Sequence, residues 1–184
     1  MLGDDLWTSG SVLYDQGRID DALADWREAV RLNPSHVDAH FNIGVALSAQ
    51  GKIEAALSEW REALRLNPDF WQASHHLGYA FYQRANSSRN PSDWQASLGA
   101  YQNVLKVKPL EADVLCCIGV IQRNLNNRQA AIEAFQETLK IDPNNKYAFD
   151  SLLSMQWRMG HWHGLWQTAN TYYPLLNSLN KAYL

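Results

Sequence analysis

Histidine is the residue type in this chain best suited to chemistry, and two of the six histidines stand at a metal-binding spacing. His36 and His40 are four residues apart, which puts two imidazoles on one face of a helix and suits zinc. However, Asn33 and Pro34 end the preceding helical pattern, so we expect His36 to precede the next helix. We therefore expect no metal site at this pair.

The other four histidines are interpreted as surface or packing residues. His75 and His76 are neighbours, and neighbouring side chains point in different directions on a helix. His161 and His163 follow Gly160 at the start of a helical pattern, where a surface role is expected.

Cys116 and Cys117 are the only cysteines, and they are adjacent within a helical pattern. A redox switch is one interpretation, but a disulfide between neighbours strains a helix. We favour two small side chains in a packed helix. The chain has no G-x-S-x-G, P-loop or H-E-x-x-H sequence and no conspicuous pair of carboxylates. We therefore expect no enzyme, no cofactor and no metal.

The composition narrows the class of protein. With 184 residues and 46% hydrophobic content, the chain is long enough to bury one continuous core. An evenly spread net charge of −3 argues against nucleic acid, which needs a clustered basic face. No apolar run reaches the ~20 residues that span a bilayer, and the start MLGDDLWTSG is unlike a secretory signal. Two cysteines make no disulfide framework, so we expect a soluble, cytoplasmic protein.

Prolines mark an internal period. The interval from Pro34 to Pro68 is the same as the interval from Pro109 to Pro143. Each period holds two helical patterns with a break between them. In repeat two this break is at Gly51, where a left-handed residue can end the first helix. Two such helices cannot cover their own apolar faces, so neighbouring copies must stack on one another.

Small and aromatic residues recur at fixed places in this period. The first helices align Gly10, Gly44, Gly78 and Gly119, and the second helices align Trp26, Trp60, Tyr101 and Phe135. A helix-turn-helix period of this length, with small, aromatic and proline positions in this order, resembles the tetratricopeptide repeat (TPR) family. The resemblance implies an all-α, right-handed superhelical solenoid with four full repeats and a degenerate fifth, capping unit.

We expect one TPR domain over residues 1–184. The predicted parts are repeats at about 3–36, 37–70, 71–111 and 112–145, and a degenerate repeat with a C-terminal cap at 146–184. We expect Trp26, Trp60, Tyr101 and Phe135 to pack between their own and the next repeat. Trp94, Trp162 and Trp166 align with apolar core positions and are also expected in the core.

Repeat three contains an insertion, because the interval from Pro68 to Pro109 is longer than the other two. Residues 86–92 are rich in turn formers, so we predict an exposed loop there, with Asp93 capping the next helix. We favour a tolerated surface insertion over a loop that contacts a partner, and expect its deletion to change stability little.

The resemblance also implies a function. In TPR proteins the first helices line a concave groove that binds segments of other proteins. The residues that helical spacing places there are Trp7, Tyr14, Phe41, Asn42, Val45, His75, His76, Tyr79, Tyr82 and Arg123. The cations with which one TPR subset grips a C-terminal carboxylate are missing here: Gln72, His76, Asp113 and Cys117 stand in the corresponding repeats. We expect aromatic packing to supply most of the affinity.

The interpretation we favour is a non-enzymatic scaffold that binds a protein or peptide segment. One alternative is a homo-oligomer that packs through the Trp-rich C-terminal unit. If the tail at 175–184 covered the apolar side of the last helix, that would argue against this alternative. The other is the TPR arm of a larger enzyme.

Overall fold

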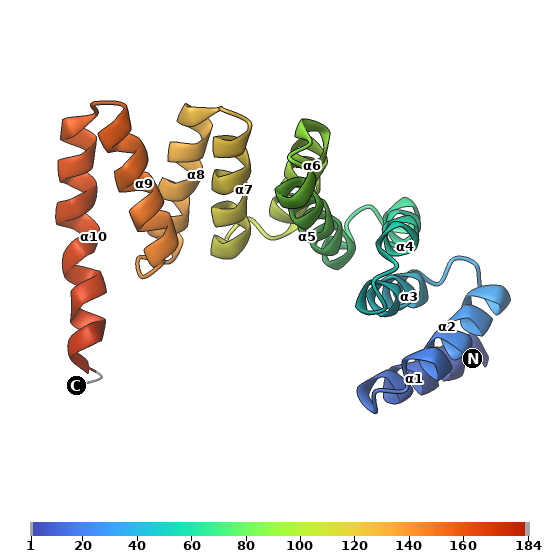
Figure 1. Cartoon of the computed structure of the whole chain (residues 1–184). Helices are drawn as coiled ribbons and strands as arrows, with labels where there is room; N and C mark the ends of the chain where they lie inside the picture. Colours follow the sequence, from blue (N-terminus) through green and yellow to red (C-terminus); the bar gives the residue numbers. More distant parts are fainter. Residues whose placement is uncertain (1, 183–184) are drawn as a thin grey trace. The chain divides into compact units, whose positions relative to one another are not determined.

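The computed structural model describes residues 2–182, with side chains as far as residue 173. These residues form ten helices and no strand, as the sequence predicts (Figure 1). The helices are α1 (Leu2–Asp15), α2 (Ile19–Leu32), α3 (Val37–Ala49), α4 (Ile53–Leu66), α5 (Trp71–Ser88), α6 (Pro91–Val107), α7 (Ala112–Asn124), α8 (Arg128–Ile141), α9 (Lys146–Arg158) and α10 (Trp162–Ala182). In the described part of the chain, no helix is both long and apolar enough to cross a membrane.

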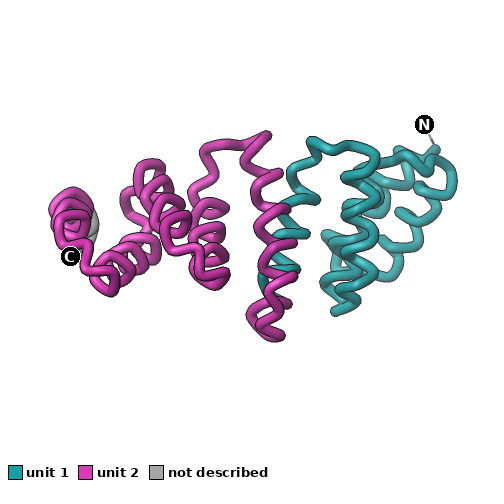
Figure 2. Tube along the Cα trace, turned by 90° about the horizontal axis from the view of Figure 1, so that it is seen from above, with its two compact units in different colours: residues 1–83 teal, residues 84–184 magenta. Residues whose placement is uncertain are grey.

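The chain divides into two compact units, residues 1–83 and 84–184, coloured separately in Figure 2. In the first unit, α1 packs on α2 and α3 on α4, and the first helices α1 and α3 also touch. In the second unit, α7 packs on α8 and α9 on α10, with α7 and α9 in contact. The organisation of the two units as a single domain stays a prediction.

The turns inside the helix pairs use left-handed residues. Gly17, Gly51 and Gly160 have φ values of 76°, 75° and 67°, and Asn126 has φ 63°. Asparagine is the side-chain-bearing residue that tolerates this conformation best, which suits Asn126 to the turn in repeat four. In the second repeat, the backbone N–H of the residue after Gly51 bonds to the carbonyl of Leu47 at 2.9 Å, closing the end of α3.

The core is built where an aromatic ring of the second helix meets a glycine of the first. A Cβ atom on Gly44 would lie 2.6 Å from Cδ1 of Trp60, so only glycine admits the indole this closely. The ring nitrogen of Trp60 donates to the carbonyl of Phe41 at 3.3 Å. The first repeat has the same arrangement: Trp26 lies against Gly10 and donates to a carbonyl of α1 at 3.0 Å.

In repeat four a phenylalanine takes the tryptophan's place. A Cβ atom on Gly119 would lie 2.6 Å from Cε1 of Phe135, whose ring also faces Tyr147 of the next repeat at 6.5 Å. Likewise, the Trp60 ring lies 5.1 Å from that of His76 in its next repeat. Trp26, Trp60, Tyr101 and Phe135 are all at most 2% exposed, so their prediction as core residues is confirmed.

The insertion in repeat three is helical, and the predicted loop over residues 86–92 is wrong. The helix α5 continues to Ser88, Arg89 turns the chain with φ 54°, and α6 starts at Pro91. Asn90, rather than Asp93, caps α6 by accepting a hydrogen bond from the Ser92 backbone N–H at 3.0 Å. Asparagine followed by proline is a strong helix-start signal, which outweighs the turn preference of the preceding polar residues.

The inserted residues are exposed as predicted, but they lie next to a partly buried ion pair. The carboxylate of Asp93 is buried and accepts from the Arg84 guanidinium at 2.7 Å. Trp94, beside it, is also buried, as the sequence predicts. Deleting the segment would separate these partners, so the structure argues against a neutral deletion.

The C-terminal tryptophans do not lie in the core. Trp162 and Trp166 on α10 are 57% and 63% exposed, which contradicts their predicted burial. A repeat position is buried only when a following helix packs over it, and α10 packs mainly against α9. The backbone of α10 runs as one helix to Ala182, so residues 175–182 continue that helix and do not fold back over it. The side chains of residues 174–182 lie outside the part of the chain that the structure describes.

Candidate functional site

The candidate residues of the first unit lie on its first helices, α1, α3 and α5. Trp7 and Tyr14 belong to α1 and are half-buried. The Tyr14 ring packs on Trp26 at 5.7 Å, and the Trp7 ring lies 6.0 Å from that of His36. Both aromatic residues thus help to hold the first repeat together, and each leaves part of its ring open to solvent.

Phe41 and His76 form the centre of an aromatic cluster. Their rings are 5.2 Å apart and meet edge to face, the geometry that aromatic pairs prefer. The Phe41 ring also meets Phe70 edge to face at 5.3 Å. Burial lowers the pKa of His76, with His75 adding to the effect, so its ring is favoured in the neutral form. Rings from α3, from the turn between α4 and α5, and from α5 itself thereby pack into one aromatic cluster.

Tyr79 lies one helical turn after His76 and is 54% exposed. Residues three apart share a face of a helix, so the open ring of Tyr79 stands next to the packed cluster. His75 and Tyr82 on the same helix are half-buried. The structure therefore places an open aromatic side chain one helical turn from the aromatic cluster.

The remaining candidates divide between the two units. Asn42 and Val45 on α3 are half-buried. Arg123 is exposed, belongs to the second unit and donates to the Tyr147 hydroxyl at 3.1 Å. The structure thus brings Phe41, His75 and His76 into one cluster, whereas Arg123 belongs to the second unit.

Phe70 belongs to this cluster but is absent from the sequence prediction. It lies directly before α5 and packs on Phe41. An apolar residue just before a helix often packs back on that helix and fixes the entry of the chain, so its position was a usable signal.

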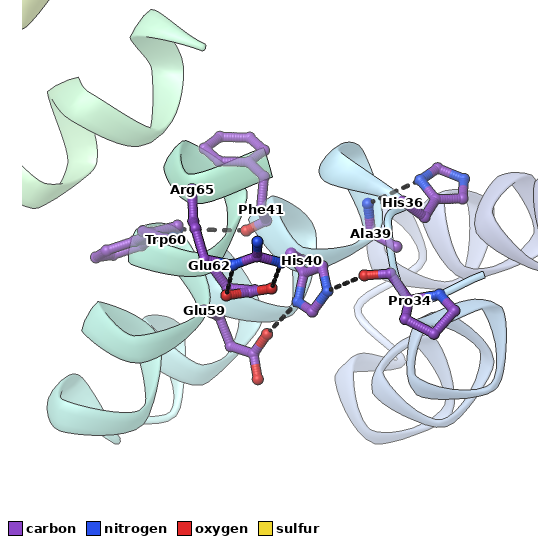
Figure 3. A network of polar contacts seen from close by, with 9 residues as sticks. All are labelled: Pro34, His36, Ala39, His40, Phe41, Glu59, Trp60, Glu62 and Arg65. Atoms are coloured by element: carbon purple, nitrogen blue, oxygen red, sulfur yellow. Dashed lines mark hydrogen bonds and ion pairs between the residues drawn. The ribbon is translucent and has the colours of Figure 1, made fainter. Parts of the chain in front are cut away.

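The pair His36 and His40 has a structural use (Figure 3). His36 precedes α3, as predicted, and its Nδ1 accepts from the backbone N–H of Ala39 at 3.3 Å. His40 is buried, with Nδ1 2.7 Å from the Glu59 carboxylate and Nε2 3.1 Å from the carbonyl of Pro34. Two oxygen acceptors face the two ring nitrogens, and only the doubly protonated imidazolium donates to both.

The contact with Glu59 should make the stability of the first unit depend on pH. The hydrogen bond to Glu59 raises the pKa of His40, so the folded state favours the charged ring. This stabilisation is fully present below the unfolded pKa of about 6.5 and is lost as pH rises through the higher folded value. Glu59→Gln should therefore reduce the free energy of unfolding more at about pH 6 than at about pH 9. Urea unfolding at both values measures the difference.

A matched control for this pH dependence is Glu28→Gln. Glu28 forms a comparable exposed pair with Arg31 at 2.6 Å, without a histidine. Its loss should cost little stability, and equally little at both pH values, because exposed ion pairs contribute little. Equal pH dependence in the two variants would contradict the role given to His40.

The two thiols are poorly suited to redox chemistry. Burial raises the pKa of Cys116 to about 11, and burial likewise raises the pKa of Cys117. Both are free cysteines. The thiolate is the reactive form, so raised pKa values favour the packing interpretation over a redox switch.

Comparison with known proteins identifies the repeat. The family model described as "TPR repeat" matches residues 10–51 and 46–84, and the one described as "Tetratricopeptide repeat" matches residues 112–145. Together they cover more than half of the chain. A search of curated proteins finds no match.

Solved structures with this fold resemble the chain over nearly all of its length. MamA from Desulfovibrio magneticus RS-1 has 18% identity and a TM-score of 0.76, and the match covers 98% of this chain and 96% of that one. A second MamA crystal structure has 21% identity and a TM-score of 0.74, covering 95% and 97%. Pseudomonas aeruginosa PilF has 16% identity and a TM-score of 0.68, covering 94% and 76%.

Identities this low show the fold alone, and the fold of these structures agrees with the helix pairs of this chain. The glycine and aromatic columns, the left-handed turns and the family match all lead to the same assignment. The chain belongs to the tetratricopeptide repeat family, whose repeats build scaffolds for protein interaction.

Proposed function

We propose that this protein is a non-enzymatic binding module that holds a segment of a partner protein against the first helices of its repeats. Exposed Tyr79 beside the cluster of Phe41 and His76 is the observation that supports this most directly. In the first unit, the proposed contact residues are Trp7, Tyr14, Phe41, Asn42, Val45, His75, His76, Tyr79 and Tyr82.

The physical argument rests on entropy and contact area. A tyrosine on a helix loses little freedom when it is covered, and its ring offers a large apolar face with a polar tip. The aromatic cluster one helical turn away is already ordered by the packing of Phe41 on Phe70 and His76. The half-buried amide of Asn42 on the neighbouring helix can bond to the backbone of an extended segment.

Several side chains that might serve catalysis have other uses, which supports a non-enzymatic role. His36 caps α3, and both nitrogens of His40 have hydrogen-bond partners. The raised pKa values of Cys116 and Cys117 disfavour a thiolate nucleophile. Free thiols fit the reducing cytoplasm, and the net charge of −3 fits a protein partner better than nucleic acid.

Tyr79→Ala tests the proposal. The tagged wild-type protein should capture its partner from native lysate, and Tyr79→Ala should lose most of that capture while keeping its helicity and melting temperature. Tyr173→Ala is the matched control, because Tyr173 is an equally open tyrosine (59% exposed) on α10. Equal capture by all three proteins would mean that Tyr79 is not part of the binding surface.

Phe41→Ala is a poorer test than its position suggests. Its ring contacts Phe70 and His76, so the variant should also lose stability. The single Tyr79 variant is therefore the sharper test of the binding surface.

A second candidate function is self-association through the C-terminal unit. Trp157 and Trp162 meet edge to face at 4.8 Å, and both are more than half exposed, as is Trp166. Exposed aromatic clusters of this kind often mark interaction surfaces. Sedimentation velocity should then show a concentration-dependent oligomer that Trp166→Ser weakens. A monomer at all concentrations would remove this candidate.

A further inference from the structure

The second unit contains a cavity of about 510 Å³ with three arginines in its lining. Arg123 lies in the last turn of α7, Arg128 is the first residue of α8 and Arg158 is the last residue of α9. Met155, which is buried, adds an apolar surface, and Ser154 adds a hydroxyl group. None of the described residues that line the cavity is acidic.

The three arginines are a peculiarity of this end of the chain. In the first two repeats, the places of Arg123 are taken by Tyr14 and Ser48, and those of Arg158 by Asp15 and Ala49. Arg128 stands where α2 and α4 begin with Ile19 and Ile53. The TPR pattern itself therefore does not require a cation at any of these places.

The usual structural reasons for an arginine explain this set only in part. A cation near a helix C-terminus offsets the helix dipole, which accounts for Arg123 and Arg158. Arg128 is at a helix N-terminus, where the same dipole disfavours a cation.

Ion pairing does not explain the set either. Arg18, Arg31 and Arg65 each pair with a carboxylate three residues away. In the described part of the chain, none of the three cavity arginines forms an ion pair. Arg123 bonds to a hydroxyl, that of Tyr147.

We propose that this cavity binds the carboxylates of an acidic segment of a partner protein. Guanidinium groups match carboxylates in charge and geometry, and three of them around one cavity can hold two neighbouring acidic side chains. The volume is that of an ordinary ligand pocket. Met155 provides the surface on which the methylene groups of a glutamate pack.

The inference deepens the proposed function, since it names the chemistry of the segment bound by the second unit. It also changes the sequence-based expectation that aromatic contacts supply most of the affinity. Arg123 and Ser154 come from the first helices of two successive repeats, and Arg128 comes from a second helix. The site is thus at the helix ends around the α7–α8 turn.

A titration with a labelled hexaglutamate peptide tests the site without knowledge of the native partner. Binding to the chain of residues 1–184 is measured by fluorescence anisotropy at low ionic strength (about 50 mM), where exposed charges are little screened. Replacing Arg123, Arg128 and Arg158 with glutamine should weaken binding by at least about tenfold. Arg128→Gln alone should weaken it by about threefold and guards against an unfolded triple variant.

The matched control removes the same total charge from the first unit, with Arg18→Gln, Arg31→Gln and Arg65→Gln together. It should leave hexaglutamate binding within about twofold of wild type. Equal losses in the two triple variants would overturn the proposal, because they would show a general charge effect. Absence of measurable binding to the wild type up to about 1 mM peptide would overturn it as well.

The two proposals fail separately. Loss of the Tyr79 effect in lysate capture would leave the hexaglutamate titration unchanged, because the arginines belong to the second unit. Conversely, a chain that does not bind hexaglutamate can still capture a partner through Tyr79.

Discussion

Replacing Trp60 with alanine is expected to lower the free energy of unfolding by about 3–5 kcal/mol, as for other large aromatic residues removed from a packed core. Trp60 is 1% exposed, and its ring packs against the backbone at Gly44 and lies 5.1 Å from the ring of His76. Truncation leaves a cavity between two repeats and removes the hydrogen bond to the carbonyl of Phe41. Urea unfolding followed by far-UV circular dichroism measures the loss.

Trp166→Ala is the control for this experiment, because it deletes the same side chain from a site that is 63% exposed. It should change the free energy of unfolding by no more than about 0.5 kcal/mol. A loss of that small size for Trp60→Ala would contradict its role in the core.

The helix pairs and their core were predictable because the signals are local. Gly17, Gly51 and Asn126 mark turns that need a left-handed residue, and the structure gives each a positive φ. Trp26 and Trp60 occupy the same position in successive repeats, each opposite a glycine. A repeat fold has few other ways to bury them.

Two features depended on surroundings that the repeat pattern does not encode. The helix α5 continues through Asn86 to Ser88, although these residues favour turns, because the next strong start signal is Asn90 with Pro91. Trp166 shares a position with core residues of other repeats, yet it is exposed because burial there needs a further helix.

The candidate sites were likewise only partly predictable from the sequence. The cluster of Phe41 and His76 was foreseeable, since both residues lie on first helices of successive repeats. The cavity lined by Arg123, Arg128 and Arg158 was not, because it gathers single residues from the ends of three helices. Single residues of this kind form no periodic pattern, so they emerge only once the turns are placed.

Gly44→Ala is expected to lower the free energy of unfolding by about 1–3 kcal/mol, although alanine is the better helix former. Gly44 is buried in the middle of α3, where an added Cβ would lie 2.6 Å from Cδ1 of Trp60. The indole is 1% exposed and also packs near the ring of His76, so it has little room to move away. The clash should therefore outweigh the helix propensity gained, which is at most about 1 kcal/mol. Urea unfolding of the two proteins gives the difference.

Gly99→Ala separates the clash from the effect on helix propensity. Gly99 is exposed inside α6, and a Cβ there would meet nothing within 4 Å. This variant should be more stable than wild type by about 0.5–1 kcal/mol, because only the cost of glycine in a helix is removed. In a Trp60→Leu background, Gly44→Ala should cost less than it does in wild type, since the smaller side chain leaves space for the methyl group. A stabilising Gly44→Ala, or an equal cost in both backgrounds, would show that the close approach of the indole to this glycine does not determine the packing of the repeat.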